Sequence, residues 1–190
     1  MPGDYKYLDW NGDGEINGQD EHPFAFDQTP WLNFSMNLET AYKSFDLALL
    51  FQGSALGSMQ YKEPLYAIWG SNGGGTLTQY LDRWHPVDPT ADPYDPSIEW
   101  VEGYYGYTGR YPKENSQFNR VSTSYLRLKS LEVGYTLPPL SSLRMRVFAN
   151  AYNLFTITKV RFVDPEHPDD DLGRMYPLNK TFTVGLSLSY

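Results

Sequence analysis

The residues with the most specific spacing form an acidic loop near the start of the chain, at positions 9–20. Its sequence, DWNGDGEINGQD, matches the calcium-loop template D-x-[DN]-x-D-G with an acidic residue at the twelfth position. Alternate positions carry the oxygens that a hard cation takes, and glycine at the sixth position permits a sharp turn. The ligand candidates are Asp9, Asn11, Asp13, Glu15 through its backbone carbonyl, and Asp20. The loop predicts a Ca²⁺ site, and the alternative is a polar Asn-Gly-Asp-Gly turn without an ion.

A second set of candidates consists of aromatic side chains in the long segment 56–120. Aromatic faces with amide and carboxylate neighbours can stack on sugars or line a peptide-binding surface. They can equally pack the segment on itself or against a partner protein, and for any single residue this alternative is favoured. The candidates for ligand or partner contact are Trp69, Trp84, Trp100, Tyr104, Tyr105 and Tyr107.

Motifs for catalysis are missing from the sequence. His22, His85 and His167 each precede a proline, with no second histidine at ligand spacing. The sequence also has no G-x-S-x-G elbow, no H-E-x-x-H and no phosphate-binding glycine loop. The acidic cluster of Asp164, Glu166, Asp169, Asp170 and Asp171 is interpreted as a solvated or lipopolysaccharide-facing loop and not as a catalytic pair. A hydrolase would need two carboxylates converging in a cleft. We therefore expect that the protein is not an enzyme.

The composition narrows the class of protein. The 190 residues include 16 glycines, 14 prolines and 16% aromatic residues, which favours short strands and loops over helices. A net charge of −8 argues against a general nucleic-acid binder, and the absence of cysteine excludes disulfides and thiolate metal sites. The first residues lack the basic and apolar regions of a secretory signal, so an exported protein would have to be represented here by a fragment.

Five segments alternate between apolar and polar residues with the period of a β-strand. The clearest is the last, at positions 181–190, whose ten residues match the roughly 9–11 that cross a bilayer as a tilted strand. Its apolar parity predicts a set of lipid-facing residues, namely Phe182, Val184, Leu186, Leu188 and Tyr190.

The four other segments lie upstream, at about 32–42, 45–52, 124–137 and 144–155. Only Lys43 and Ser44 separate the first two, which predicts a tight hairpin. Leu126 and Leu128 have the opposite parity to Leu131 and Val133, which predicts a β-bulge near Lys129. The alternation in 144–155 does not assign the outward face of that strand.

Short and long connections alternate between these strands, as in transmembrane barrels with short periplasmic turns and long outer loops. The fold expected is an all-β, antiparallel transmembrane β-barrel segment with long extracellular loops. The expected parts are an extracellular loop with the calcium-type motif (1–30), a β-hairpin of the barrel wall (31–55), a long aromatic-rich extracellular loop (56–120), a barrel strand pair (121–155), an acidic extracellular loop (156–178) and the C-terminal barrel strand (179–190).

Six pieces of the sequence, in order, resemble one family over nearly the whole chain. They are PGDYKYLDWNGDGEING, AYKSFDLALLFQG, YLDRWHPVDPTA, STSYLRLKSLEVGYTLP, NAYNLFTITK with its following DPE, and YPLNKTFTVGLSLSY. The chain resembles the C-terminal portion of SusC/RagA-type TonB-dependent outer-membrane transporters of Bacteroidetes. One departure is Asp88, which stands before Pro89 where the family usually has asparagine.

The resemblance implies the last five strands of a barrel of about 22 strands that encloses a plug. It implies location in the bacterial outer membrane and import of oligosaccharides or peptides. The implied partners are membrane lipid, the remainder of the barrel and plug, a SusD-type surface lipoprotein, and TonB through a part N-terminal to this segment. From a different class, the alternative is a soluble calcium-stabilised β-sandwich that binds glycans through its aromatic loops.

Overall fold

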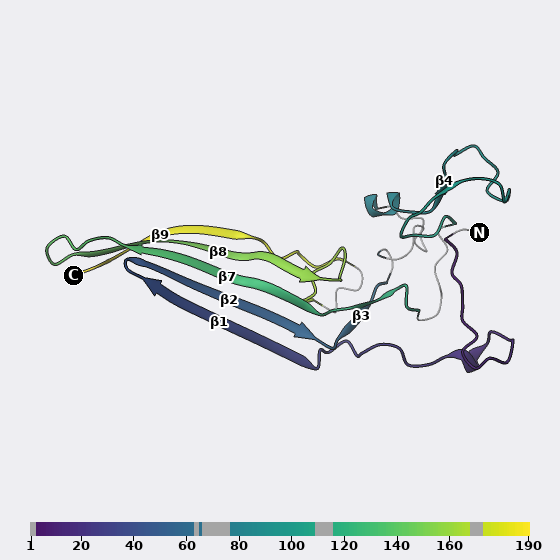
Figure 1. Ribbon diagram of the computed structural model, residues 1–190, viewed down its shortest axis with the longest axis horizontal. Coiled ribbons are helices and arrows are strands. Elements are labelled where there is room, and N and C mark those ends of the chain that lie inside the picture. Colours follow the sequence, from purple (N-terminus) through teal and green to yellow (C-terminus); the bar gives the residue numbers. More distant parts are fainter. Residues whose placement is uncertain (1–2, 63–64, 66–76, 109–115, 168–172) are drawn as a thin grey trace. The chain divides into compact units, whose positions relative to one another are not determined.

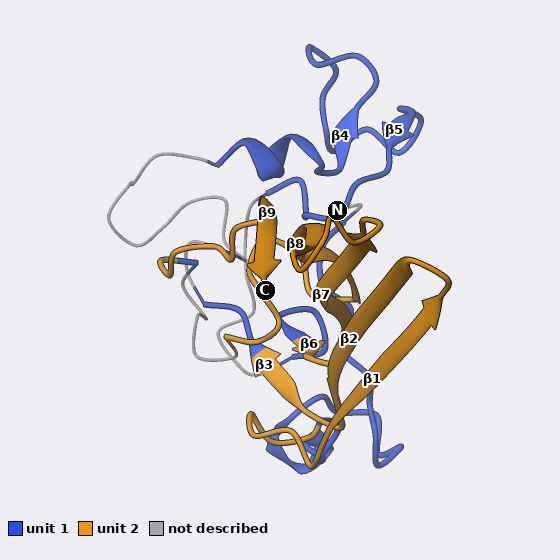
Figure 2. Cartoon of the chain, turned by 90° about the vertical axis from the view of Figure 1, so that its left-hand side faces the viewer, with its two compact units in different colours: residues 1–25, 60–120, 171–173 blue, residues 26–59, 121–170, 174–190 orange. Residues whose placement is uncertain are grey.

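The computed structural model describes residues 3–62, 65, 77–108, 116–167 and 173–190. These residues form two compact units, which Figure 2 shows in different colours. Unit 1 comprises residues 1–25, 60–120 and 171–173, and unit 2 comprises residues 26–59, 121–170 and 174–190. Within the described residues, no helix has the length and apolar character needed to span a bilayer.

A five-stranded antiparallel sheet dominates unit 2 (Figure 1). Its strands are β1 (Leu32–Tyr42), β2 (Phe45–Ala55), β7 (Tyr125–Thr136), β8 (Arg144–Thr158) and β9 (Thr181–Ser189). The strand order is β1-β2-β7-β8-β9, so each strand pairs with those that precede and follow it among the five. The sheet is open, since β1 and β9 each have one partner among the described residues. The predicted all-β, antiparallel fold is confirmed.

The remaining elements are short. They are the 3-10 turns η1 (Gly18–Asp20) and η2 (Thr78–Leu81) and the strands β3 (Ser58–Gln60), β4 (His85–Pro86), β5 (Trp100–Val101) and β6 (Arg120–Ser122). Strands β3 and β6 pair with each other, as do β4 and β5. Most of unit 1 is therefore held by turns and side-chain packing instead of by long ladders.

The register of the large sheet separates two chemically different faces. One cross-strand row runs through Thr40, Leu47, Val133, Ala149 and Val184. The adjacent row, one residue along each strand, runs through Glu39, Ala48, Glu132, Asn150 and Thr183. Because successive side chains point to opposite faces, the first row belongs to an apolar face and the second to a polar face.

A β-bulge interrupts β7 at Lys129, as the change of parity predicts. Leu50 pairs with Ser130 and Phe51 pairs with Leu128, so Lys129 has no partner on β2. On the other side, β8 is irregular at Asn153, which has a positive φ of 54°. The bulge brings Arg127 and Lys129 to the polar face of the sheet, because an uninterrupted strand would turn them to the apolar face.

The register also assigns the outward face of β8, which the sequence leaves open. Met145, Val147, Ala149 and Ala151 lie opposite Leu188, Leu186, Val184 and Phe182. These four odd-numbered residues of β8 therefore share the apolar face with the even-numbered residues of β9.

The predicted tight hairpin between β1 and β2 is also confirmed, with Lys43 and Ser44 as its two turn residues. Lys43 has a φ of 56°, in the left-handed region that two-residue hairpin turns require. Its ammonium lies 5.3 Å from the centre of the Tyr42 ring.

Candidate functional site

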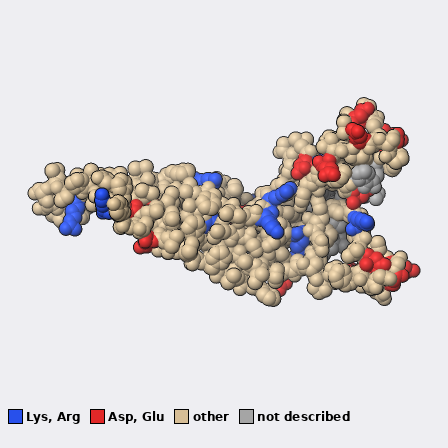
Figure 3. Space-filling view, in the orientation of Figure 1, with Lys and Arg blue, Asp and Glu red and all other residues tan. Residues whose placement is uncertain are grey.

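The apolar face of the large sheet is exposed instead of being covered by other parts of its unit. Val184 is 78% exposed and Phe182 is 71% exposed, although both are apolar. The structure places the predicted lipid-facing residues Phe182, Val184, Leu186 and Leu188 on this one face, and Tyr190 follows β9. Figure 3 shows few charged side chains over the sheet on the side in view. An apolar surface of this extent marks a contact surface for a partner or a membrane.

The polar face carries a charged group that spans three strands. Arg146 on β8 donates to Asp46 on β2, with Nε 3.0 Å from Oδ1, and to Glu132 on β7, with Nη2 2.6 Å from Oε1. Gly134 lies beneath this bridge, where a Cβ would overlap both Arg146 and Asp46. Its missing side chain lets the guanidinium reach across β7.

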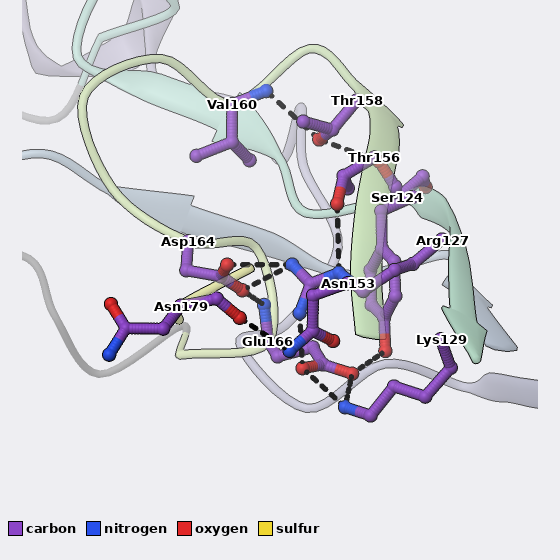
Figure 4. Close-up of polar contacts among 11 residues, drawn as sticks. Ser124, Arg127, Lys129, Asn153, Thr156, Thr158, Val160, Asp164, Glu166 and Asn179 are labelled. Atoms are coloured by element: carbon purple, nitrogen blue, oxygen red, sulfur yellow. Dashed lines mark hydrogen bonds and ion pairs between the residues drawn. The ribbon is translucent and has the colours of Figure 1, made fainter. Parts of the chain in front are cut away.

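A second charged group lies at the bulged end of β7 (Figure 4). Arg127 is 1% exposed and donates through Nε to Thr156 at 2.8 Å, through Nη1 to Glu166 at 2.6 Å, and through Nη2 to both oxygens of Asp164. Lys129 Nζ lies 3.1 Å from both carboxylate oxygens of Glu166, and the Tyr125 hydroxyl donates to that carboxylate at 3.0 Å. We call Tyr125, Arg127, Lys129, Thr156, Asp164 and Glu166 the Arg127 cluster.

The Arg127 cluster corrects one interpretation of the sequence. The carboxylates of Asp164 and Glu166 are only 16% and 15% exposed, so for these two residues a solvated acidic loop is wrong. The other acidic residues of that segment, at 169–171, lie outside the described residues. The parity switch in the sequence indicates that Arg127 leaves the apolar face, but it does not indicate which residues pair with it.

In the acidic loop of residues 9–20, side-chain oxygens accept hydrogen bonds from the backbone amides of the same loop. The two carboxylate oxygens of Asp9 accept from the amides of Gly12 at 2.6 Å and Gly14 at 2.8 Å. Further along, Asn11 accepts from the Asp13 amide and Asp13 from the Glu15 amide, both at 2.8 Å. Gly12 and Gly14 have φ values of 77° and 87°, which glycine adopts without strain. The loop backbone thus has the sharp turn that the calcium template requires.

Asp20 closes this loop. Its carboxylate accepts from the amides of Asn17 and Trp10, each at 2.8 Å, and the bond from Asn17 is the main reason that the pKa of Asp20 lies below its ordinary value. In the described part of the chain, no group of three or more Asp, Glu or His side chains is placed to hold a metal ion. The oxygen-rich donor set still suits a hard cation, so the Ca²⁺ site remains a prediction.

If the loop binds calcium, the ion will stabilise unit 1. We expect Ca²⁺ at a hundredfold excess over its dissociation constant to add about 2.7 kcal/mol to the unfolding free energy. Replacing Asp13 by alanine should abolish this gain, as measured by the thermal midpoint with Ca²⁺ and with chelator. Asp92→Ala is the matched control, because Asp92 also accepts from a nearby amide, that of Tyr94, but lies outside the loop. Identical midpoints with and without Ca²⁺ in the parent would remove the site.

The candidate Tyr105 is a core residue of unit 1. It is 2% exposed and forms a hydrophobic cluster with Tyr80, against which Tyr104 and Phe118 pack. Its hydroxyl donates to the Leu65 carbonyl at 3.1 Å and accepts from Nε2 of the Gln79 side chain at 3.2 Å. These contacts support the packing interpretation of Tyr105 and Tyr104.

Three other aromatic candidates, Trp84, Trp100 and Tyr107, are half-buried. The rings of Trp100 and Tyr107 meet edge to face, with centroids 5.1 Å apart. Trp84 packs on Gly3, where a Cβ would overlap its side chain, and its amide donates to the Tyr105 carbonyl at 2.8 Å. Trp69 lies outside the described residues. The structure therefore brings Trp100 and Tyr107 together.

Burial of Tyr105 predicts an alkaline limit to the stability of unit 1. Desolvation raises the pKa of Tyr105 well above its ordinary value of about 10. A raised folded-state pKa contributes stability that is complete below the unfolded pKa and is lost as the pH rises through the folded one. Replacing Tyr105 by phenylalanine should cost about 1 kcal/mol at pH 7, through the lost hydrogen bond, and flatten the loss of stability above pH ~10. Denaturant unfolding of both proteins at pH 7 and at high pH measures this, and parallel profiles would contradict it.

Two known proteins resemble the chain over almost its whole length. No family model matches the chain. Two proteins of Formosa agariphila, TonB-dependent receptor P3 and TonB-dependent receptor P26, are each 28% identical to it. The alignments cover 100% and 99% of this chain and 19% and 20% of the relatives, so the chain spans about a fifth of their length.

Solved structures of one assembly resemble the chain. The RagAB peptide importer matches with a TM-score of 0.65 and 23% identity in its closed-closed state, and 0.61 and 24% in its open-open state. Each match covers 93% of this chain and 19% of the other. At this level of identity the similarity shows a shared fold.

Proposed function

We propose that the chain corresponds to a C-terminal portion of a TonB-dependent receptor and forms part of the wall of an outer-membrane importer. The observation that carries this proposal is the two-faced sheet of unit 2. Its apolar face is exposed, whereas its polar face holds the ion pairs of Arg146 and Arg127. This is the arrangement of a barrel wall, apolar toward lipid and polar toward the lumen.

A soluble β-sandwich accounts less well for the same sheet. A sandwich buries the apolar face of each sheet against a second sheet about 10 Å away. Among the described residues the other two sheets have two strands each, and the apolar residues of β9 are exposed. A bilayer would cover this face without a second sheet.

In this proposal, the unpaired edges of β1 and β9 join other strands of a larger barrel. Open edges do not persist in lipid, because each unsatisfied backbone group costs several kcal/mol. The short β1–β2 and β7–β8 turns would face the periplasm, and the long connections between the other strands would face outward. A plug within the barrel, TonB and a SusD-type lipoprotein are the partners proposed for the whole protein.

The proposed cargo is a peptide or an oligosaccharide too large for porins. The peptide alternative is supported by the shared fold with a chain of the RagAB peptide importer. Growth of a gene-deleted strain on peptide and on glycan mixtures would separate the two classes of cargo.

Membrane extraction tests the proposed location. We expect the protein to fractionate with outer membranes, to need detergent for solubility, and to migrate faster in gels before heating than after it. A monomer that unfolds cooperatively in plain buffer would contradict the barrel and support the sandwich.

A further inference from the structure

The segment that follows β8, residues 159–167, folds back onto the polar face of its own sheet. Figure 4 shows this segment returning past Val160 to Asp164 and Glu166, which meet Arg127. Arg127 receives two separate carboxylates from it, at 2.6 Å each. Both partners come from a stretch of three residues, so a single turn of the chain supplies the whole negative side of the Arg127 cluster.

Hydrogen bonds within the turn also hold its shape. The Glu166 amide donates to the Asp164 carboxylate at 2.9 Å, and the His167 amide donates to the Asp164 carbonyl at 3.0 Å. Pro165, between the two acids, is buried. The two carboxylates are therefore presented to Arg127 in one fixed arrangement.

The start of the segment is also tied to the strands. The Val160 amide donates to the Thr158 hydroxyl at 3.1 Å, and that hydroxyl donates to the Ser124 carbonyl, next to β7, at 3.0 Å. Val160 itself is 8% exposed. Both ends of the segment are thus anchored, one at Thr158 and one at the Arg127 cluster.

We propose that residues 159–167 form a fixed strap, latched by Arg127, that stays docked on the polar face instead of moving as a free loop. That this face is the inner face of a barrel rests on the proposed function, whereas the latch rests only on contacts within unit 2. Arg127 is a positioning residue, because its buried guanidinium holds the strap through Asp164 and Glu166. Removing one partner of a buried ion pair is strongly unfavourable, so the undocked fraction should be on the order of 1% or less.

Cysteine accessibility tests the latch in the full protein that carries this chain. Val160→Cys provides a buried reporter within the strap, and this chain has no other cysteine. We expect a membrane-impermeant maleimide to label it slowly in intact cells and in detergent-purified protein. Adding Arg127→Ala should raise the labelling rate at least about tenfold, since an uncompensated buried charge favours undocking. Arg127→Lys, which cannot make the planar bidentate pair, should give a smaller rise.

Arg146→Ala is the matched control, because it breaks the other charged group of the same face and should leave the reporter unchanged. If Arg127→Ala fails to reach the membrane, Glu166→Gln takes its place and should give an increase of at least about threefold, as it keeps the Asp164 pair. The strap would be overturned if the Val160→Cys reporter reacts as fast as a cysteine at the exposed position of Lys159. It would also be overturned if the latch variants leave the labelling rate of the reporter unchanged, or if the reporter reacts faster in energised cells than in uncoupled ones. Heat-dependent gel mobility of the same samples reports separately on the barrel, so failure of the strap and failure of the proposed function are distinguishable.

Discussion

Replacing Val184 by arginine is expected to destabilise the protein by about 2–4 kcal/mol, the cost of an arginine on the lipid face near the middle of a membrane-spanning strand. Val184 lies centrally in β9, is 78% exposed, and belongs to the apolar row that crosses all five strands. In water such an exposed side chain would tolerate a charge almost without cost. A large loss therefore indicates lipid as the surroundings of this face. Urea unfolding of the detergent- or lipid-refolded protein measures it.

The adjacent residue gives a matched control within the same strand. Thr183 points to the polar face and lies opposite Asn150, in the row that contains Glu132 and Glu39. An arginine at this position has carboxylates nearby and no lipid to enter, so Thr183→Arg should change the unfolding free energy by less than about 1 kcal/mol. Equal losses for the two variants, or a larger loss for Thr183→Arg, would contradict the assignment of the two faces.

The strands could be predicted because their information is local. The alternation of β9 and the two-residue turn at Lys43 and Ser44 are properties of neighbouring residues. The bulge at Lys129 follows from the same kind of reasoning, since the leucines on its two sides have opposite parity. Period-two patterning therefore predicts both the strands and the bulge at Lys129, where β7 changes face.

The outward face of β8 could not be predicted, because Phe148 and Tyr152 alternate with Val147 and Ala151 and no parity is clearly polar. The pairing with β9 decides it, and pairing is not a local property. Phe148 lies on the polar face, where its ring occupies the space left by Gly185. An aromatic residue on the polar face hides the pattern that β9 shows openly.

The Arg127 cluster also lay beyond the sequence, for a related reason. Its carboxylates come from residues 37 and 39 positions away, and nothing in the spacing indicates that they return to β7. The same acidic residues would look identical in a solvated loop. The burial of Tyr105 could not be predicted either. Tyrosine is common in binding surfaces, but Tyr105 belongs to the core of unit 1.

That core makes Gly103 the position in unit 1 where a single methyl group should matter most. A Cβ on Gly103 would overlap backbone atoms of Arg83. Backbone atoms cannot move aside as the end of a flexible side chain can. The two segments meet here because the amide of Tyr105 donates to the Asp82 carbonyl at 3.1 Å and the Trp84 amide donates to the Tyr105 carbonyl at 2.8 Å. Gly103→Ala would force them apart and is expected to cost about 1–3 kcal/mol or more.

The loss should be confined to unit 1, because the clash separates only the two segments that hold Tyr105. Limited proteolysis is expected to cut residues 77–108 faster in Gly103→Ala, while the five-stranded sheet keeps its heat-dependent gel mobility. Gly18→Ala is the matched control, since a Cβ on Gly18 meets no atom within 4 Å. If both variants resist protease like the parent, the close approach at Arg83 is not what holds Tyr105 in its core. If both are cut faster, the sensitivity belongs to glycine replacement in general and not to this contact.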